Sequence, residues 1–274
     1  MNKLRLLLII FTLGIISSGC TKESAPPDLP PEGSFVMQID NMWDDSSPGP
    51  IEASMTESRT NFIFAAANVL WWNSVLTVQM AIPAAAFLES FNHEAEWDRA
   101  GKEWIWTYSF DLNESTYTAE LHGKTGDEGI NWSMYISKSD VYTDFLWFTG
   151  ISTNDNKSGS WTLNKDPESI VKDEMDTIPF IEIVWSVNED GTAGIKYTNI
   201  EENAANFGNY IHYGTTDDPD LNAFYDIFRS WEDNLINIKW NTTDHYGRVL
   251  SMPHFTDPYW HCWDEFYRNI ACED

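Results

Sequence analysis

The chain of 274 residues is 42% hydrophobic and 15% aromatic, which supplies a sizeable core and excludes a globally disordered protein. Its formal net charge of −27 at pH 7 argues against nucleic acid as a partner, because the phosphates would repel it. The same charge argues against adsorption to anionic lipid by electrostatic attraction. We therefore expect no nucleic-acid partner.

The N-terminus has the pattern of an export signal. Two basic residues precede the apolar run Leu6–Ile16, which is too short to span a bilayer. Small residues follow, and then Cys20, a pattern that resembles the signal of a bacterial lipoprotein. Ser17 departs from that pattern, which usually has Leu there. The resemblance implies a signal peptide over residues 1–19 and lipidation of Cys20. The alternative is an ordinary secretory signal cleaved near the same point.

Residues 20–34 comprise the lipidated Cys and a proline-rich stretch that we expect to be a semi-extended tether of about 40 Å. The signal, the acidic tether and an aromatic-rich β domain together resemble uncharacterised envelope lipoproteins of the Bacteroidota. The resemblance implies an outer-membrane protein that faces the periplasm or the cell surface. Thr21 agrees, because it stands where inner-membrane lipoproteins of enteric bacteria have Asp. No activity is attached to this family, so no catalytic residue is implied.

The stretch Asn61–Leu88 contains no charged residue and predicts a long helix. Its length would suit a bilayer-spanning helix, but five polar side chains and Pro83 interrupt it. We favour a helix buried on nearly every side as the core of the fold. Thr60 or Ser58 is the expected N-cap, and Pro83 is expected to open a second short helix, Ala84–Phe91.

Beyond this helix, apolar and polar side chains alternate with period 2, which is typical of strands with one solvent-exposed face. Residues 222–231 could instead form a short helix. A further short strand is expected before the helix, at Phe35–Ile39. The runs predicted as strands after the helix are Glu103–Leu112, 116–122, 130–137, Phe145–Ile151, Gly159–Leu163, Phe180–Val187, Ala193–Ile200, Tyr210–Gly214, Phe224–Phe228 and Leu235–Trp240.

Short polar connections between these runs, such as Asn188–Gly191, imply an antiparallel up-and-down meander. About nine to eleven strands with one apolar face must curl, stack or close. The prediction is a mainly β (α+β) fold, with a curved sheet or barrel packed against one long apolar helix over residues 61–91. A single domain should cover residues 35–274.

Only Cys262 and Cys272 remain besides Cys20. An even pair in an exported protein is most simply a disulfide, which would close the tail into a small loop. A redox site would more often show the spacing C-x-x-C.

Several polar groups are candidates for metal or acid-base chemistry. A C-terminal cluster could hold zinc, but its spacings match no helical metal motif, so hydrogen-bonded or surface histidines are favoured. The turn 154–159 lacks the acid of a calcium loop at its twelfth position, and the acidic turn 217–220 needs no cation. His212 is expected to be a satisfied histidine. The members of the C-terminal cluster are Asp244, His245, His254, Asp257, His261, Asp264 and Glu265. We expect no metal and no cofactor.

Glycoside hydrolysis needs two acids about 5–10 Å apart, one with a raised pKa. Glu120 and Glu182 are the acids to inspect, since each lies in the middle of a predicted strand, although both are expected to face solvent. The leading hypothesis is a lipid-anchored envelope protein with a non-enzymatic binding or structural role. The alternative is a glycan-active hydrolase with a carboxylate pair on the sheet. An envelope protein or a glycan is the expected partner besides the membrane.

Overall fold

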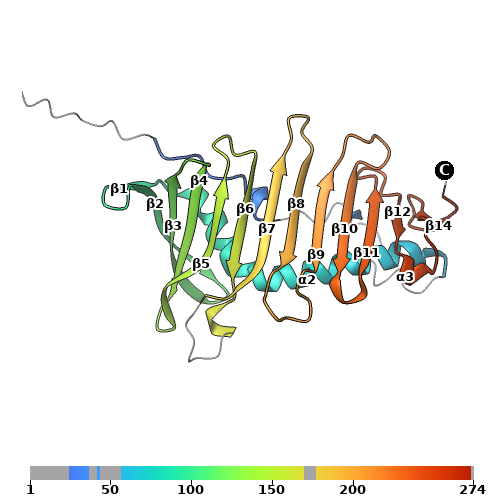
Figure 1. Ribbon diagram of the computed structural model, residues 1–274, viewed down its shortest axis with the longest axis horizontal. Helices are drawn as coiled ribbons and strands as arrows, with labels where there is room; N and C mark the ends of the chain where they lie inside the picture. The colour runs from blue at the N-terminus through green and yellow to red at the C-terminus, as the bar shows by residue number, and fades with distance from the viewer. Residues whose placement is uncertain (1–24, 37–41, 44–56, 170–176, 273–274) are drawn as a thin grey trace, which may run out of the picture.

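A computed structural model describes residues 25–36, 42–43, 57–169 and 177–272. Within these residues, fourteen strands form one antiparallel sheet, in which each strand pairs with its neighbours in the chain. A long helix, α2 (Thr60–Glu89), runs along the sheet (Figure 1). The predicted mainly β fold and the antiparallel meander are confirmed. Within the described residues the sheet ends at β1 and β14 and is not closed, so the barrel alternative is wrong.

The strand count exceeds the predicted nine to eleven, because β1, β12, β13 and β14 have only two to four residues, too few to establish a period in the sequence. The alternative helix over residues 222–231 is wrong, since β10 occupies this stretch. Phe35 and Val36 lie outside any strand, and the rest of the strand expected there lies outside the described residues. The bounds are β1 Glu96–Asp98, β2 Glu103–Leu112, β3 Ser115–Thr125, β4 Ile130–Lys138, β5 Tyr142–Ser152, β6 Ser158–Asn164, β7 Pro179–Val187, β8 Ala193–Asn199, β9 Tyr210–Thr215, β10 Ala223–Arg229, β11 Asn234–Trp240, β12 Gly247–Leu250, β13 His261–Trp263 and β14 Asn269–Ile270, with a short helix α3 at Met252–Phe255.

The helix α2 is continuous through Pro83, so the predicted break and second helix are wrong. Proline removes the hydrogen bond to the carbonyl of Gln79, but Gln79 is exposed and water can satisfy that carbonyl. The predicted N-cap is also wrong. Arg59 occupies the N-cap position without a side-chain bond, and the hydroxyl of Thr60 accepts a hydrogen bond from Asn269 instead.

Helix α2 is buried on one face, not on nearly every side as predicted. Leu76 and Met80 are only 6% and 5% exposed, whereas Trp71 and Val78 are 50% and 74% exposed. By length and composition the segment Thr60–Asn92 could cross a membrane, and 33% of its most apolar stretch is buried within the protein. A span is disfavoured, because the sheet beside α2 has an outer face that carries ionisable side chains such as Glu120.

Two buried polar side chains of α2, Asn61 and Asn68, make specific contacts with the sheet. Asn61 donates through Nδ2 to the carbonyl of Cys262 at 2.9 Å, which joins the start of the helix to β13. Asn68 Oδ1 accepts a hydrogen bond from the guanidinium of Arg229 at the end of β10. These two bonds fix the helix along the sheet near its C-terminal strands.

The N-terminal segment, residues 25–36, packs on the sheet, although its composition predicts a free tether. Asn156 in the β5–β6 turn donates to the carbonyl oxygens of Asp28 and Leu29 at 2.9 and 3.2 Å. The indole of Trp161 donates to the carbonyl of Ser34 at 3.0 Å. Proline-rich backbone has unpaired carbonyl groups, and here side chains of the sheet bind them.

Phe35 is the apolar anchor of this segment and is fully buried. Its ring lies 5.1 Å from the ring of Phe87 on α2, measured between centroids, and 4.8 Å from that of Phe148 on β5. Tyr197 donates from its hydroxyl to the Phe35 carbonyl at 3.0 Å. The core face of the sheet is therefore covered by α2 together with this segment.

Candidate functional site

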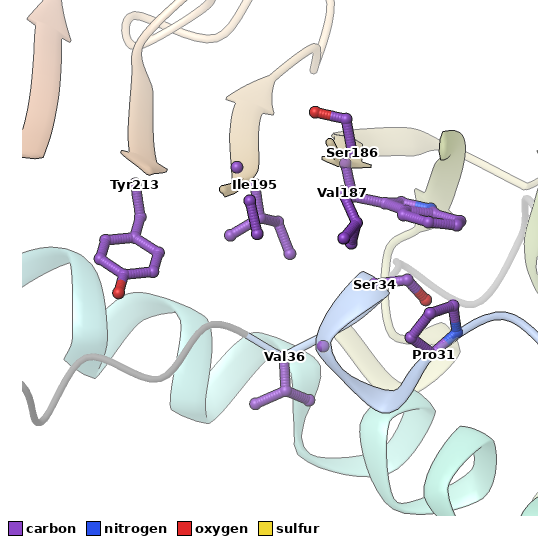
Figure 2. Close-up of a pocket in the computed structure, with 11 residues that line it drawn as sticks. Pro31, Ser34, Val36, Ser186, Val187, Ile195 and Tyr213 are labelled. Carbon is purple, nitrogen blue, oxygen red and sulfur yellow. The ribbon is translucent and has the colours of Figure 1, made fainter. Parts of the chain in front are cut away.

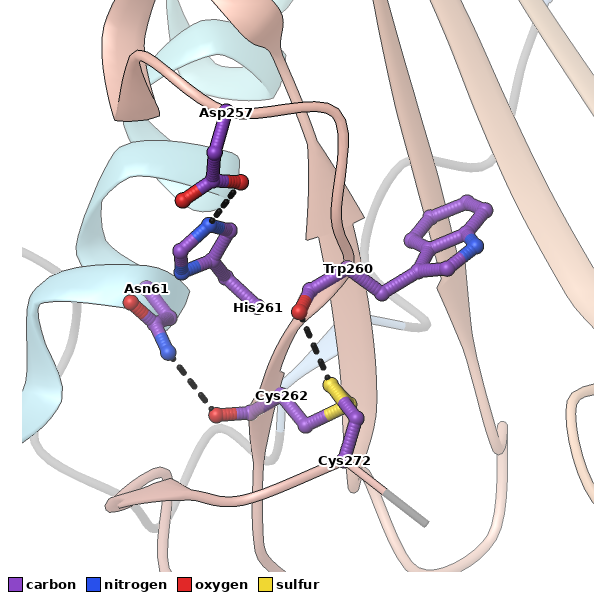
Figure 3. The surroundings of a disulfide bond; sticks show 6 residues. All are labelled: Asn61, Asp257, Trp260, His261, Cys262 and Cys272. Atoms are coloured by element: carbon purple, nitrogen blue, oxygen red, sulfur yellow. Dashed lines mark hydrogen bonds and ion pairs between the residues drawn. A yellow bond between two sulfur atoms is a disulfide. The ribbon is translucent and has the colours of Figure 1, made fainter. Parts of the chain in front are cut away.

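The disulfide between Cys262 and Cys272 is present, as predicted, with 5.3 Å between the Cα atoms (Figure 3). It joins β13 to Cys272, the second residue after β14, and Cys262 also pairs with Ile270 across the two strands. Cys272 Sγ lies 3.1 Å from the carbonyl oxygen of Trp260, a contact without a proton, since the sulfur is in the disulfide. The bridge thus fixes the last described turn of the chain against the sheet.

The C-terminal histidines do not converge on a metal site. His254 stacks on Phe64 and His261 stacks on Phe255, each with 3.7 Å between ring centroids. His261 also lies 3.1 Å from a carboxylate oxygen of Asp257 (Figure 3). The described residues contain no group of three His, Cys, Asp or Glu side chains that could hold a metal ion. These histidines have aromatic and carboxylate partners, which is the reading favoured from the sequence.

The remaining members of that cluster have other contacts. Asp264 forms an ion pair with Arg268 at 2.6 Å. The backbone carbonyl of His245 accepts a hydrogen bond from the indole N–H of Trp263. His212 on β9 is half-buried and faces Lys196 and Asp226 on the two neighbouring strands. Burial holds the pKa of His212 below its usual value, which disfavours a charged role at neutral pH.

Glu120 and Glu182 cannot act as a catalytic pair. Glu120 is on β3 and Glu182 on β7, so three strands separate them in the sheet. With about 4.8 Å between adjacent strands, the two positions are about 19 Å apart, beyond the range for glycoside hydrolysis. Both lie on the outer face, as expected, since their neighbours Leu121 and Ile183 fill the core face.

The two acidic turns are ordinary connections. In the β5–β6 turn, the carboxylate of Asp155 accepts the backbone N–H of Lys157. In the β9–β10 loop, the carboxylate of Asp218 accepts the N–H groups of Asp220 and Leu221 at 2.9 and 3.2 Å. These bonds hold the pKa of Asp218 below its usual value. The carboxylate therefore stays ionised at neutral pH and well into the acidic range.

A cavity of about 580 Å³ lies between this loop and strands β12–β14. This volume falls in the usual range of small-molecule sites. The disulfide and the fully buried Trp263 form part of its wall. Gly247 lets the Trp263 ring pack closely against the backbone of β12, because a Cβ there would lie 2.5 Å from that ring. We call this space the C-terminal cavity; its polar lining residues are Asp218, Asp220, Tyr246 and Arg248.

Opposite charges meet in the C-terminal cavity. The guanidinium of Arg248 lies over the ring of Trp260, 4.5 Å from its centroid, which orients the cation by stacking. Arg248 Nε is buried and has no hydrogen-bond partner among the described residues. The carboxylates of Asp218 and Asp220 supply acceptors at the same cavity. The arrangement can therefore bind a small ligand that carries both hydroxyl groups and an acceptor oxygen.

A second, smaller cavity of about 200 Å³ lies between the N-terminal segment and strands β7–β9 (Figure 2). Val36, Ile195 and Tyr213 give it an apolar lining. Two buried polar atoms in its lining residues, Ser34 Oγ and Trp185 Nε1, have no partner among the described residues. The volume is below the usual range of ligand sites, so the C-terminal cavity is the better candidate.

Sequence reasoning named the acids of the 217–220 turn but missed Arg248 and Trp260. The cavity joins a loop and three short strands that the sequence does not mark as neighbours. Cys20, the predicted lipidation site, lies outside the described residues. Comparison with protein-family models, with curated proteins and with solved structures found no match to this chain.

Proposed function

We propose that this chain is a lipid-anchored cell-envelope protein with a non-enzymatic binding role, and that a sugar-like ligand occupies the C-terminal cavity. The cavity lined by Arg248 together with two carboxylates is the observation that carries this proposal. Sugars present hydroxyl donors to carboxylates and ring or carbonyl oxygens to Arg. The resemblance of the N-terminus to lipoproteins of the Bacteroidota supports the anchor and an outer-membrane location.

Binding is favoured over hydrolysis for two reasons. The core face of the sheet packs against α2 and the N-terminal segment, so among the described residues this face is filled by side chains. A general acid needs a raised pKa, and the pKa of Asp218 is instead lowered by two backbone N–H groups. An ionised carboxylate is suited to accept hydrogen bonds from a ligand.

Replacing Arg248 by Ala should weaken sugar binding about 10- to 100-fold, because a hydrogen bond to a charged group contributes about 1.5–3 kcal/mol. The probes are neutral, amino and acidic hexoses and their disaccharides, tested against the full protein by saturation-transfer NMR and titration calorimetry. Lys157→Ala is the control, since Lys157 is 49% exposed in the β5–β6 turn, far from the cavity in the strand order.

The outcomes separate the alternatives. Loss of binding in Arg248→Ala with no change in Lys157→Ala supports the site. Cleavage of a disaccharide by the wild-type protein would favour the hydrolase alternative, and a complete lack of binding would remove the sugar ligand from the proposal.

The anchor is tested by growth with labelled palmitate. We expect the wild-type protein to take up label and Cys20→Ala to take up none, because the acyl groups are carried by the mature N-terminal Cys. The control is Cys262→Ala, which leaves Cys20 in place and should still be labelled. Label on the Cys20→Ala protein would contradict the lipoprotein assignment.

A further inference from the structure

The exposed face of α2 carries a ridge of apolar and small side chains, with Ser74 as its one polar member. Its members recur every four and three residues, so they lie on one side of the helix. No charged residue lies between Arg59 and Glu89. Trp71, Val78 and Leu88 on this ridge are 50%, 74% and 38% exposed. The α2 ridge consists of Ala67, Trp71, Ser74, Val78, Ala81, Ala85 and Leu88. Large apolar groups in such a row mark a contact surface.

We infer that the α2 ridge is the contact between two copies of this chain, whose helices pack antiparallel about a two-fold axis near residues 76–78. The four-three spacing is the one by which helices pack along their length. A two-fold axis makes such a contact close on itself and limits it to a dimer.

The distribution of side-chain size along the ridge decides the direction of packing. Trp71 is the one bulky side chain in the N-terminal half, and the small residues Ala81 and Ala85 lie in the C-terminal half. An antiparallel partner places Trp71 against those alanines, with Ser74 and Val78 near the axis. A parallel partner would place Trp71 against Trp71 and leave space beside the alanines. Close packing therefore favours the antiparallel pair.

Size and charge also fit a second copy. The ridge is about 32 Å long at 1.5 Å per residue. Two such ridges packed together would bury on the order of 1,000 Å² of accessible surface in total, which is the lower limit for a specific interface. The chain has a net charge of −27, and an uncharged ridge keeps the carboxylates of two copies out of the contact. A bilayer fits less well, because helices that lie on anionic membranes carry Lys or Arg along their borders and α2 carries none.

Cysteine cross-linking in cells that produce the full chain tests both the contact and its direction. Val78→Cys lies near the axis and should be joined by a short bis-maleimide into a species of twice the chain mass. Ala67→Cys, which is also exposed, should give none, because its two copies lie about 30 Å apart in the antiparallel pair. Val141→Cys is the control for random collision, since Val141 is 51% exposed in the β4–β5 turn.

Trp71→Glu, combined with Val78→Cys, should lower the cross-linked fraction about tenfold or more, because a charge replaces the largest ridge side chain. Val141→Glu in the same background should leave that fraction unchanged. Retention of the Cys262–Cys272 bridge, read by thiol alkylation, shows that each variant is folded.

Four results would overturn the inference. Equal cross-linking of Ala67→Cys and Val78→Cys would indicate a parallel or random contact, and an adduct of another mass would identify a different protein as the occupant. A monomer whose Val78→Cys thiol is shielded from a water-soluble maleimide would place the ridge in lipid. A monomer with a freely labelled thiol would show that the ridge is uncovered.

Discussion

Leu76→Asp should abolish the cooperative thermal transition of the domain. Leu76 is 6% exposed on the buried face of α2. The substitution removes a large apolar contact, worth about 1.5–3 kcal/mol, and places an unpaired carboxylate in the core at a further cost of several kcal/mol. Because a domain is stabilised by about 5–15 kcal/mol in total, the sum is enough to unfold it. Near-ultraviolet circular dichroism, dominated by 14 Trp, is the measurement.

Thr77→Asp is the matched control for this experiment. Thr77 is the next residue in the helix and is exposed, so the same carboxylate there stays in water. We expect its melting temperature to stay close to that of the wild type. If Leu76→Asp kept a native spectrum and a native melt, α2 would not be part of the core, and the packing of the helix on the sheet would be wrong.

Phe35→Ala should lower the free energy of unfolding by about 3–5 kcal/mol, as is usual for a buried aromatic side chain. The ring is fully buried and has Phe87, Phe148 and Trp161 within 5.9 Å, measured between centroids. The cavity would open between elements far apart in the chain, so neighbours cannot collapse into it easily. The midpoint of urea unfolding, at constant slope, measures the change.

Phe207→Ala provides the comparison, since Phe207 is 52% exposed in the loop between β8 and β9. Its effect should remain within about 0.5 kcal/mol. Equal shifts in the two variants would mean that the N-terminal segment does not contribute to the stability of the domain.

The sheet could be predicted from the sequence wherever a strand is long enough to show alternation. Residues Tyr117, Ala119 and Leu121 on β3 are buried and their neighbours Thr118 and Glu120 are not, which is the pattern seen in the sequence. Strands of two to four residues, such as β13, have no period to detect. In the structure β13 pairs with β12, and the disulfide joins it to Cys272 after β14.

The two surfaces of α2 could not be separated from the sequence. Apolar side chains on nearly every side of a helix predict that the whole helix is buried, but a single sheet covers only one side of it. The docking of the N-terminal segment cannot be predicted from its composition either. Its prolines and acids predict a free tether, whereas Phe35 and the carbonyl of Ser34 bind side chains that lie more than a hundred residues away. Composition does not reveal contacts of that separation.

Only the acidic residues of the candidate cavity could be predicted from the sequence. The sequence predicts an acidic turn at 217–220, and in the structure the carboxylate of Asp218 accepts two N–H groups of that turn. Its second role depends on Arg248, which stands about thirty positions later and gives no local motif. The stacking of Arg248 on Trp260 is a contact between a strand and a loop, and only the fold brings them together.

If Cys20 carries lipid, as proposed, the docked N-terminal segment would also set how far the domain can move from the membrane. The bond from Asn156 fixes the backbone at Asp28, and residues 21–27 of the sequence form the leash between that point and Cys20. At about 3.1 Å per residue such a leash reaches about 22 Å. Copies held this close to a bilayer diffuse in a thin layer, where their effective concentration is far above that in free solution. Even a weak contact between helices would then be populated at modest copy number.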